Sequence, residues 1–251
     1  MELIDLIAYL DTYLRVHEIA DYGPQGLQLE ADKTQIQRVA LAVDVAPQII
    51  ETAVSWNADM LLVHHGILWR NVERIAGPLG QRVRLLLKAN VHLYAAHLPL
   101  DAHPEVGNNA VLAQMLGVAI STWWCAPKGT PLAVNGSLAE PLPLAQFVQR
   151  VEDQLDTKAR VLAHGPKDVR QVAILSGFGA DQVAEAKSLG VDTFLTGETS
   201  HANYWAAEDY GMNVIYAGHY ATETVGVQAL GRHLAEKFGL DVQFFHFPTA
   251  M

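Results

Sequence analysis

The sequence has one cysteine, no run of basic residues and no long apolar run, and each of these scarcities excludes a class of protein. Cys125 stands alone among 251 residues, so neither an internal disulfide nor a cluster of cysteine ligands can form. With 17 basic against 27 acidic residues, the chain offers no basic stripe for duplex nucleic acid. The apolar runs are too short to predict a membrane span, and the N-terminus lacks the basic region of a signal peptide. We therefore expect a cytoplasmic protein.

What the sequence does contain is typical of an α/β protein. Half of its residues are apolar and 18% are charged, which is enough for a large core. Apolar residues at helical spacing predict a helix over 2–16, and a turn rich in glycine and proline at 21–26 precedes a short strand. Strands and helices then alternate, as in crossover units on a largely parallel sheet. The expected strands are 38–43, 60–63 and 91–96, and the expected helices are 47–56 and 79–88.

Parts of the second half of the chain can be aligned with parts of the first. When residues 39–41 are aligned with 172–174, Asp59 falls on Asp192 without a gap. After a gap in the next connection, Tyr94-Ala95-Ala96-His97 falls on Tyr216-Ala217-Gly218-His219. Either two unrelated crossover units look alike or the chain has two similar lobes, with largely parallel sheets flanked by helices. The two-lobe interpretation predicts a first lobe at 1–118, a connection at 119–170 that contains a strand and a helix at 144–155, and a second lobe at 171–251.

Histidines and carboxylates gather where the predicted strands end, and in open α/β sheets the functional groups collect at these ends. Such a gathering indicates either hydrogen-bonded acid–base pairs or a metal site. Because one ion takes three or four protein ligands, six candidates indicate two ions, about 3.5–4 Å apart, that share bridging groups. Four nitrogens and two oxygens favour iron, zinc, manganese, nickel or cobalt over magnesium or calcium. The six candidates are His64, His65, His97, Asp101, His219 and Glu223.

Each candidate also has a structural explanation. A regular strand would point His64 and His65 to opposite faces, but Gly66 permits a turn that reunites them. Asp101 alternatively forms a turn, and Glu223 is alternatively an acidic residue in the first turn of a helix. The remaining histidines that we interpret as core or surface groups are His17, His92, His164, His233 and His246.

The two histidine–carboxylate pairs have the same spacing. Pro99 argues against a helix across the first interval, and Thr222 suits the N-cap of a helix that begins after His219. We therefore expect both pairs to join a strand end to a loop that folds the carboxylate back beside the imidazole. The turn at 176–179 either offers backbone N–H groups to a phosphate or is only a tight turn. The sequence has no HExxH, GxSxG, Walker or GxGxxG signature.

Motifs along nearly the whole chain carry a family resemblance. They lie at 21–28, 63–66, 97–105, 107–109, 196–198 and 217–223. Together they resemble the short bacterial branch of the Nif-three-like dinuclear metal centre proteins, many of which are named GTP cyclohydrolase I type 2 homologues. The resemblance implies a two-lobed α/β fold with the metals between the lobes, a ring-shaped hexamer, and the same six metal ligands. It also implies that Glu198 either bonds to a metal ligand without binding the metal itself or carries a proton. His201 matches a histidine that only some relatives keep.

Two functions are consistent with these residues. The first is a metal-dependent hydrolase that acts on a nucleotide-like small molecule, with two divalent ions of iron, zinc or manganese and with Glu198 contributing to turnover. The second is a metal carrier in which the ions are cargo. A scaffold with structural metal is disfavoured, because six ligands over two ions leave coordination positions open. The expected partners are further copies of this chain in a homohexamer, to which an exposed Trp123-Trp124 pair would contribute, and a small nucleotide-like ligand.

Overall fold

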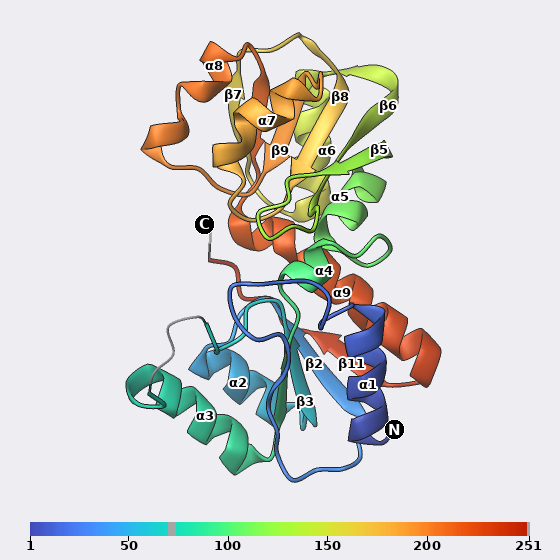
Figure 1. Cartoon of the computed structure of the whole chain (residues 1–251), viewed down its shortest axis with the longest axis vertical. Helices are drawn as coiled ribbons and strands as arrows, with labels where there is room; N and C mark the ends of the chain where they lie inside the picture. Colours follow the sequence, from blue (N-terminus) through green and yellow to red (C-terminus); the bar gives the residue numbers. More distant parts are fainter. Residues whose placement is uncertain (70–73, 250–251) are drawn as a thin grey trace. The chain divides into compact units, whose positions relative to one another are not determined.

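The computed structural model describes residues 1–69 and 74–249, and these form a mixed α/β chain (Figure 1). Contacts within the chain divide it into two compact units. Unit 1 consists of Met1–Val106 and Gly226–Phe247, and unit 2 is built from Gly107–Val225. Among the described residues, no helix combines the length and the apolar character needed to cross a bilayer.

Unit 1 contains a five-stranded sheet in the order β1-β4-β3-β2-β11. Its four strands β4, β3, β2 and β11 run parallel, and β1 pairs antiparallel with β4 at the edge. The strands are β1 (Gly26–Leu29), β2 (Arg38–Ala42), β3 (Met60–Val63), β4 (His92–Ala95) and β11 (Asp241–Phe244). The helices are α1 (Leu3–Tyr13), α2 (Pro47–Ser55), α3 (Gly77–Ala89), the short α4 (Leu98–Asp101) and most of α9 (His219–Phe238). The helices and strands predicted over residues 2–96 are thus confirmed, with small differences at their ends.

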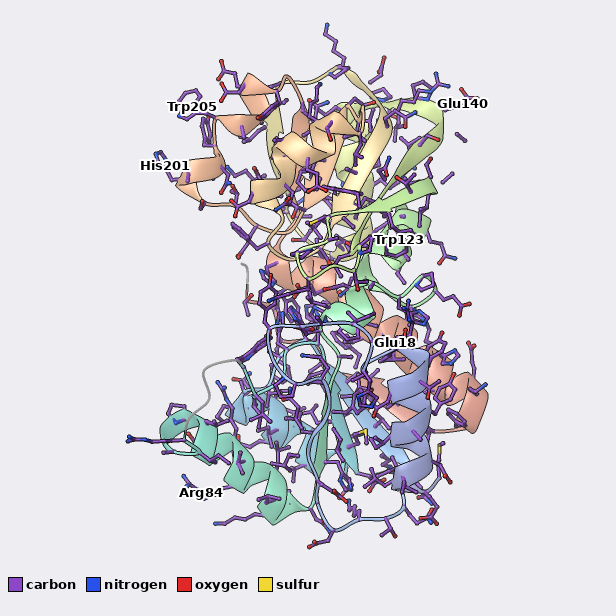
Figure 2. All side chains as sticks on the ribbon, in the orientation of Figure 1. Glu18, Arg84, Trp123, Glu140, His201 and Trp205 are labelled. Carbon is purple, nitrogen blue, oxygen red and sulfur yellow. The ribbon has the colours of Figure 1, made fainter. Side chains whose placement is uncertain are left out.

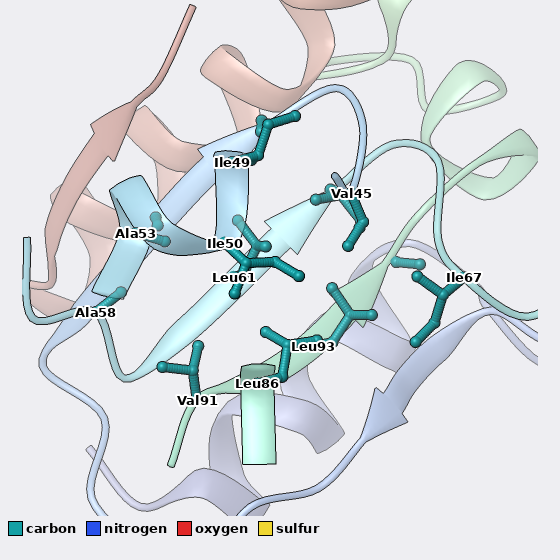
Figure 3. Packing of buried hydrophobic residues seen from close by; sticks show 14 residues of the cluster. Val45, Ile49, Ile50, Ala53, Ala58, Leu61, Ile67, Leu86, Val91 and Leu93 are labelled. Atoms are coloured by element: carbon teal, nitrogen blue, oxygen red, sulfur yellow. The ribbon is translucent and has the colours of Figure 1, made fainter. Parts of the chain in front are cut away.

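One face of this sheet packs against α2 and α3 (Figure 3). Alternate residues of β2, β3 and β4 point toward that side, including Leu61 and Leu93, because successive strand residues face opposite sides. Ile50 of α2 and Leu86 of α3 cover them, and all four side chains are buried. Replacing a side chain such as Leu61 by alanine would reduce stability by about 2–5 kcal/mol. On the other face, α9 lies so close to β2 that a Cβ on Gly231 would clash with Leu41. The sheet and its helices therefore hold the carboxyl ends of β3 and β4 in fixed positions.

Unit 2 contains a six-stranded sheet in the order β5-β6-β8-β9-β10-β7. Its central strands β8, β9 and β10 run parallel, and the outer strands are antiparallel to their neighbours. The strands are β5 (Val118–Trp124), β6 (Ala133–Pro143), β7 (Arg160–Ala163), β8 (Asp168–Leu175), β9 (Thr193–Thr196) and β10 (Asn213–Tyr216). The helices are α5 (Asn108–Leu116), α6 (Leu144–Leu155), α7 (Val183–Ser188) and α8 (Ala206–Asp209), with 3₁₀ turns η1 (Ala180–Gln182) and η2 (His201–Asn203).

The unit boundaries differ from the predicted ones. Residues 119–170 are not a separate connection, because β5, β6 and β7 complete the sheet of unit 2 and α6 packs on it. Residues 226–247 belong to unit 1, because β11 pairs with β2 there. Trp124 is buried and packs edge-to-face on Phe194, so the expected exposed tryptophan pair is wrong. Strand pairing, which joins residues far apart in the sequence, decides the two boundary differences, and side-chain packing on Phe194 decides the third.

The internal repeat is confirmed in the central strands. Val39 of β2 pairs with Met60 of β3, and Val172 of β8 pairs with Thr193 of β9 at the same offset. The two aligned aspartates also make the same contacts. Asp59 Oδ2 accepts the backbone N–H groups of residues 37 and 38, both at 2.9 Å. Asp192 Oδ2 accepts those of residues 170 and 171, at 2.9 and 2.7 Å. Asp59 thereby fixes the start of β2, and Asp192 binds the third and fourth residues of β8.

The next strand of the repeat departs from the sequence alignment by one residue. Tyr94 pairs with Leu62, but Leu195 pairs with Ile215 rather than with Tyr216. The structural equivalent of His97 is therefore Gly218, and His219 comes one position later. Gly218 has a φ of +95°, a conformation that glycine adopts readily, and it supplies the additional residue between the strand and the histidine.

Candidate metal centre

Three histidines of unit 1 come together at the carboxyl ends of two adjacent strands. His64 and His65 follow β3, and His97 follows β4, which pairs with β3 in parallel. One ring nitrogen of each histidine lies within 4.8 Å of those of the other two. The ring centroids are 4.8 Å apart for His64 and His65, 5.1 Å for His64 and His97, and 5.5 Å for His65 and His97. The structure thus groups these three predicted ligands, which we call the three-histidine cluster.

The adjacent histidines share the cluster because β3 ends before them. After Val63 the chain bends, and the N–H of His65 donates to the carbonyl of Val43 at 2.7 Å. The two rings then tilt toward each other at 45°. A Cβ on Gly66 would displace the amide of Gln28, whose Oε1 accepts the N–H groups of Ile67 and Leu68. The chain thus turns where we predicted, and His64 and His65 do not point to opposite faces as they would in a regular strand.

Each ring of the cluster donates a hydrogen bond from Nδ1 to an oxygen atom. His64 donates to the carbonyl of Ala96 at 2.9 Å. His65 donates to Asp44 Oδ1 and His97 donates to Asp21 Oδ1, both at 2.8 Å. Carbonyl and carboxylate oxygens only accept, so in the neutral rings the lone pair lies on Nε2. Metal-binding histidines are oriented in this way, and the donor set therefore fits a transition-metal ion.

Asp101 lies beside the cluster from the end of α4. It is buried, and its Oδ2 is 3.7 Å from His64 Nε2. Its N–H donates to the carbonyl of His97 at 3.1 Å, so the pair spans one helical turn. The predicted strand–loop arrangement is wrong here, because Pro99 occupies the first turn of α4, where an N–H has no partner within a helix.

Two residues of the segment 21–28 accept hydrogen bonds from the backbone at His97 and Leu98. Asp21 Oδ2 accepts the N–H of Leu98 at 2.8 Å, and Gln25 Oε1 accepts the N–H of His97 at 2.8 Å. Burial would raise the pKa of the Asp21 carboxyl, but its hydrogen bonds with His97 and with the backbone hold that pKa below its usual value. Asp21 therefore stays ionised and orients the His97 ring.

Asp21 and Asp44, which bond to two histidines of the cluster, were not predicted from the sequence. Asp21 begins a recognised motif, but 76 residues separate it from His97. Asp44 precedes its histidine partner by 21 residues and follows β2. Its position after a strand that neighbours β3 was the only signal that could have identified it, since the ends of neighbouring parallel strands meet at one edge.

Unit 2 holds a second group of predicted residues. Nε2 of His219 is 3.1 Å from Glu223 Oε1, and its Nδ1 is 3.2 Å from Glu198 Oε1. Burial lowers the pKa of His219, but the hydrogen bonds and negative charges of Glu223 and Glu198 outweigh this and raise it to about 9. Glu198 follows β9 and is positioned to orient His219, as Asp21 orients His97.

The second histidine–carboxylate pair is also helical, which corrects the predicted strand–loop arrangement. α9 begins at His219, so Glu223 lies one turn further along the same helix. The sharp bend at Gly218 allows the helix to start at once. Thr222 does not act as its N-cap, because its hydroxyl accepts the N–H of Gly177 at 3.0 Å and donates within the helix.

The turn at 176–179 approaches this pair closely. Gly177 has a φ of +64°, and a Cβ there would clash with Glu223 Oε1 and lie 3.3 Å from His219 Nε2. The N–H groups of Ser176, Gly177 and Gly179 bond to the side chains of residues 109, 222 and 196. These internal bonds favour the tight-turn interpretation over phosphate binding.

Two histidines that we interpreted as core or surface groups, His92 and His233, make structural contacts. His92 is buried, accepts the N–H of Ala31 at 3.0 Å and donates to the carbonyl of Lys33 at 2.8 Å. The His233 ring stacks on Tyr13, with their centroids 4.4 Å apart. His201 is exposed at the start of η2 (Figure 2).

Comparison with known proteins finds relatives over the full length of the chain. The model of the Duf34/NIF3 (NGG1p interacting factor 3) family matches residues 1–250. A protein of Deinococcus radiodurans named GTP cyclohydrolase 1 type 2 homolog is 40% identical over 98% of this chain and 94% of its own length. A protein of Pyrococcus abyssi with the same name is 40% identical over the whole of both chains.

Solved structures show the same fold. The TTHA1606 protein of Thermus thermophilus is 37% identical, covers 100% of both chains and superposes with a TM-score of 0.91. The ybgI protein, described as of unknown function, is 36% identical with the same coverage and a TM-score of 0.93. This chain therefore belongs to the Duf34/NIF3 family.

Proposed function

We propose that the protein is a metal-dependent hydrolase of a nucleotide-like small molecule and that six side chains hold two divalent transition-metal ions. The six are His64, His65, His97, Asp101, His219 and Glu223. The observation that carries the proposal is the common orientation of the three-histidine cluster, in which every Nδ1 is bound to an oxygen atom. The relatives' name, GTP cyclohydrolase 1 type 2 homolog, supports a nucleotide-like substrate.

In such a site the residues have three roles: binding the ions, orienting the histidine rings and taking up a proton. The four imidazoles with Asp101 and Glu223 bind the ions, and Asp21, Asp44 and the carbonyl of Ala96 keep the rings of the three-histidine cluster in place. A bound pair of such ions supplies Lewis acidity and makes water more acidic. Glu198 keeps one oxygen at His219 Nδ1, and its side chain is one-third exposed, so its carboxylate is able to take up a proton from the substrate side.

Metal content tests the central claim. We expect purified protein to carry close to two transition-metal ions per chain, and His97→Ala and Glu223→Ala each to lower that number. His17→Ala is a matched control, because the His17 side chain is largely exposed and lies outside the candidate ligands. If elemental analysis finds no metal after reconstitution with iron, zinc and manganese, the proposal is wrong.

Activity is tested separately, on metal-loaded protein with a panel of nucleotides. Hydrolysis of at least one member, abolished in His97→Ala, would support the hydrolase. A protein that transforms no nucleotide and transfers its metal rapidly to a chelator would contradict the hydrolase and support the metal carrier instead.

A further inference from the structure

Two aromatic side chains stand next to the three-histidine cluster, and neither has a role in the function described so far. We propose that Trp69 and Tyr22 bind a planar heteroaromatic ring of the substrate. The inference rests on the proposed function, because it names the part of the nucleotide-like molecule that unit 1 recognises.

The two side chains are placed around one ligand of the cluster. The Trp69 ring centroid is 5.3 Å from that of His97, with the planes at 86°, and 6.2 Å from that of His65. The Tyr22 ring centroid is 6.2 Å from that of His97, with the planes at 54°. A molecule that reached a metal ion at His97 would therefore meet both rings.

Both rings remain accessible. The exposed fraction is 37% for Trp69 and 42% for Tyr22, although large aromatic side chains are usually well buried. Side chains that served only to shield His97 from water would be expected to pack against it and to be buried. Exposed aromatic surface beside candidate metal ligands is instead typical of a binding site, in which apolar walls accompany a few polar groups.

The backbone holds the two rings in place before any ligand arrives. Gln28 Oε1 accepts the N–H groups of Ile67 and Leu68, at 2.8 and 3.3 Å, and so fixes the segment that leads to Trp69. A Cβ on Gly23 would clash with the carbonyl of Leu68 and lie 3.1 Å from the Cα of Trp69. The segment 21–28 therefore packs directly against the one that carries Trp69.

The same segment is bonded to the cluster. Tyr22 follows Asp21, which accepts from the His97 ring, and Gln25 accepts from the His97 backbone. The motif at 21–28 thus connects both aromatic rings with a metal ligand. A rigid placement of this kind lowers the entropy lost when a flat ligand binds.

The aromatic faces of the two side chains favour a ligand that contains a nucleobase. Aromatic side chains bind nucleobases by stacking on their faces, and truncation to alanine weakens binding by about 5-fold to 150-fold per base. Stacking depends on the π-face rather than on a particular hydrogen-bond pattern, so several bases should bind. A sugar phosphate without a base offers no such face.

Isothermal titration of the metal-loaded protein with guanosine, cytidine and ribose 5-phosphate tests the proposal. We expect the two nucleosides to bind and ribose 5-phosphate to bind at least about fivefold more weakly. Trp69→Ala and Tyr22→Ala should each weaken nucleoside binding by at least about fivefold, whereas Trp69→Phe and Tyr22→Phe should keep most of it. Trp205→Ala is the matched control, since Trp205 is 59% exposed and its ring packs on Tyr204 rather than on a candidate ligand (Figure 2).

The proposal is overturned if neither nucleoside binds, if both alanine variants bind like wild type, or if the phenylalanine variants lose as much affinity as the alanine variants. Elemental analysis of the same samples separates this failure from that of the proposed function. Normal metal content with unchanged nucleoside binding in the alanine variants contradicts only the aromatic site. Absence of metal from the wild-type protein contradicts the metal-dependent function itself.

Discussion

Replacing Asp21 by asparagine would remove the charge that orients His97 while keeping the shape of the side chain. In the structure, Asp21 Oδ1 accepts from His97 Nδ1 and Oδ2 accepts from the N–H of Leu98, both at 2.8 Å. An asparagine has only one carbonyl oxygen, so its NH₂ group would face one of these two donors. The Asp21 side chain is 2% exposed, and water therefore cannot replace the lost acceptor.

The size of the effect follows from these contacts. A hydrogen bond to a charged group contributes about 1.5–3 kcal/mol. Loss of the partner that orients a metal-binding histidine typically weakens metal affinity by about 10–100-fold, which corresponds to a similar free energy. We therefore expect Asp21→Asn to weaken metal binding by about 10–100-fold.

Asp44→Asn provides a graded comparison. Asp44 bonds His65 at the same distance of 2.8 Å, but its side chain is 40% exposed. Water can take over as acceptor there, so we expect a loss of less than about tenfold. The order of the two effects, Asp21 greater than Asp44, follows from the burial of Asp21 and from the second hydrogen bond that it accepts, from the N–H of Leu98.

Competition for zinc against a chromophoric chelator at neutral pH would measure both affinities, with urea unfolding to verify that each variant is folded. Asp59→Asn is the control, because its carboxylate bonds the start of β2 rather than a histidine, and it should alter stability without altering affinity. An unchanged affinity in Asp21→Asn, or a larger loss in Asp44→Asn, would refute the reasoning.

Four further predictions concern stability, turnover and assembly. Gly177→Ala should lower metal content and stability, because its Cβ would displace Glu223 and its φ disfavours alanine; elemental analysis and thermal unfolding measure both. Burial opposes ionisation of Asp59, but Lys33 and two backbone N–H groups hold its pKa below 3.8. Its stabilisation, about 1–3 kcal/mol, is therefore present above that pH and lost as the pH falls through the folded-state pKa. Asp59→Asn should be destabilised in urea at pH 7, and its difference from wild type should shrink as the pH is lowered further. Glu198→Gln should keep its metal and lose at least about tenfold in hydrolysis of the nucleotide that the panel identifies; loss of metal would make it a ligand or an essential orienting group. We expect a closed homohexamer, and a monomer by light scattering at micromolar concentration would contradict this.

Much of the fold could be predicted because its signals are local. The strand at 60–63 and the helix at 144–155 were predicted with the bounds that the structure has, since apolar alternation and helical periodicity act over a few residues. The strand ends that carry His64, His65 and His97 followed from these patterns. The start of α9 at His219 could not be predicted, because it depends on the positive φ of Gly218 after β10. The register of β10 is in turn set by its pairing with β9.

By itself, the sequence determined the strands and helices over residues 2–96 and the histidines that follow two of those strands, and it indicated a repeat. These features depend on residue types within a few positions of one another. Only the tertiary structure decided that Asp21 orients His97, that Asp44 orients His65, and that β11 joins the first sheet. Those relations join residues that are far apart in the chain. They exist because parallel pairing brings the ends of β2 and β3 to one edge of the sheet, and because antiparallel pairing sets the start of β1 beside the end of β4.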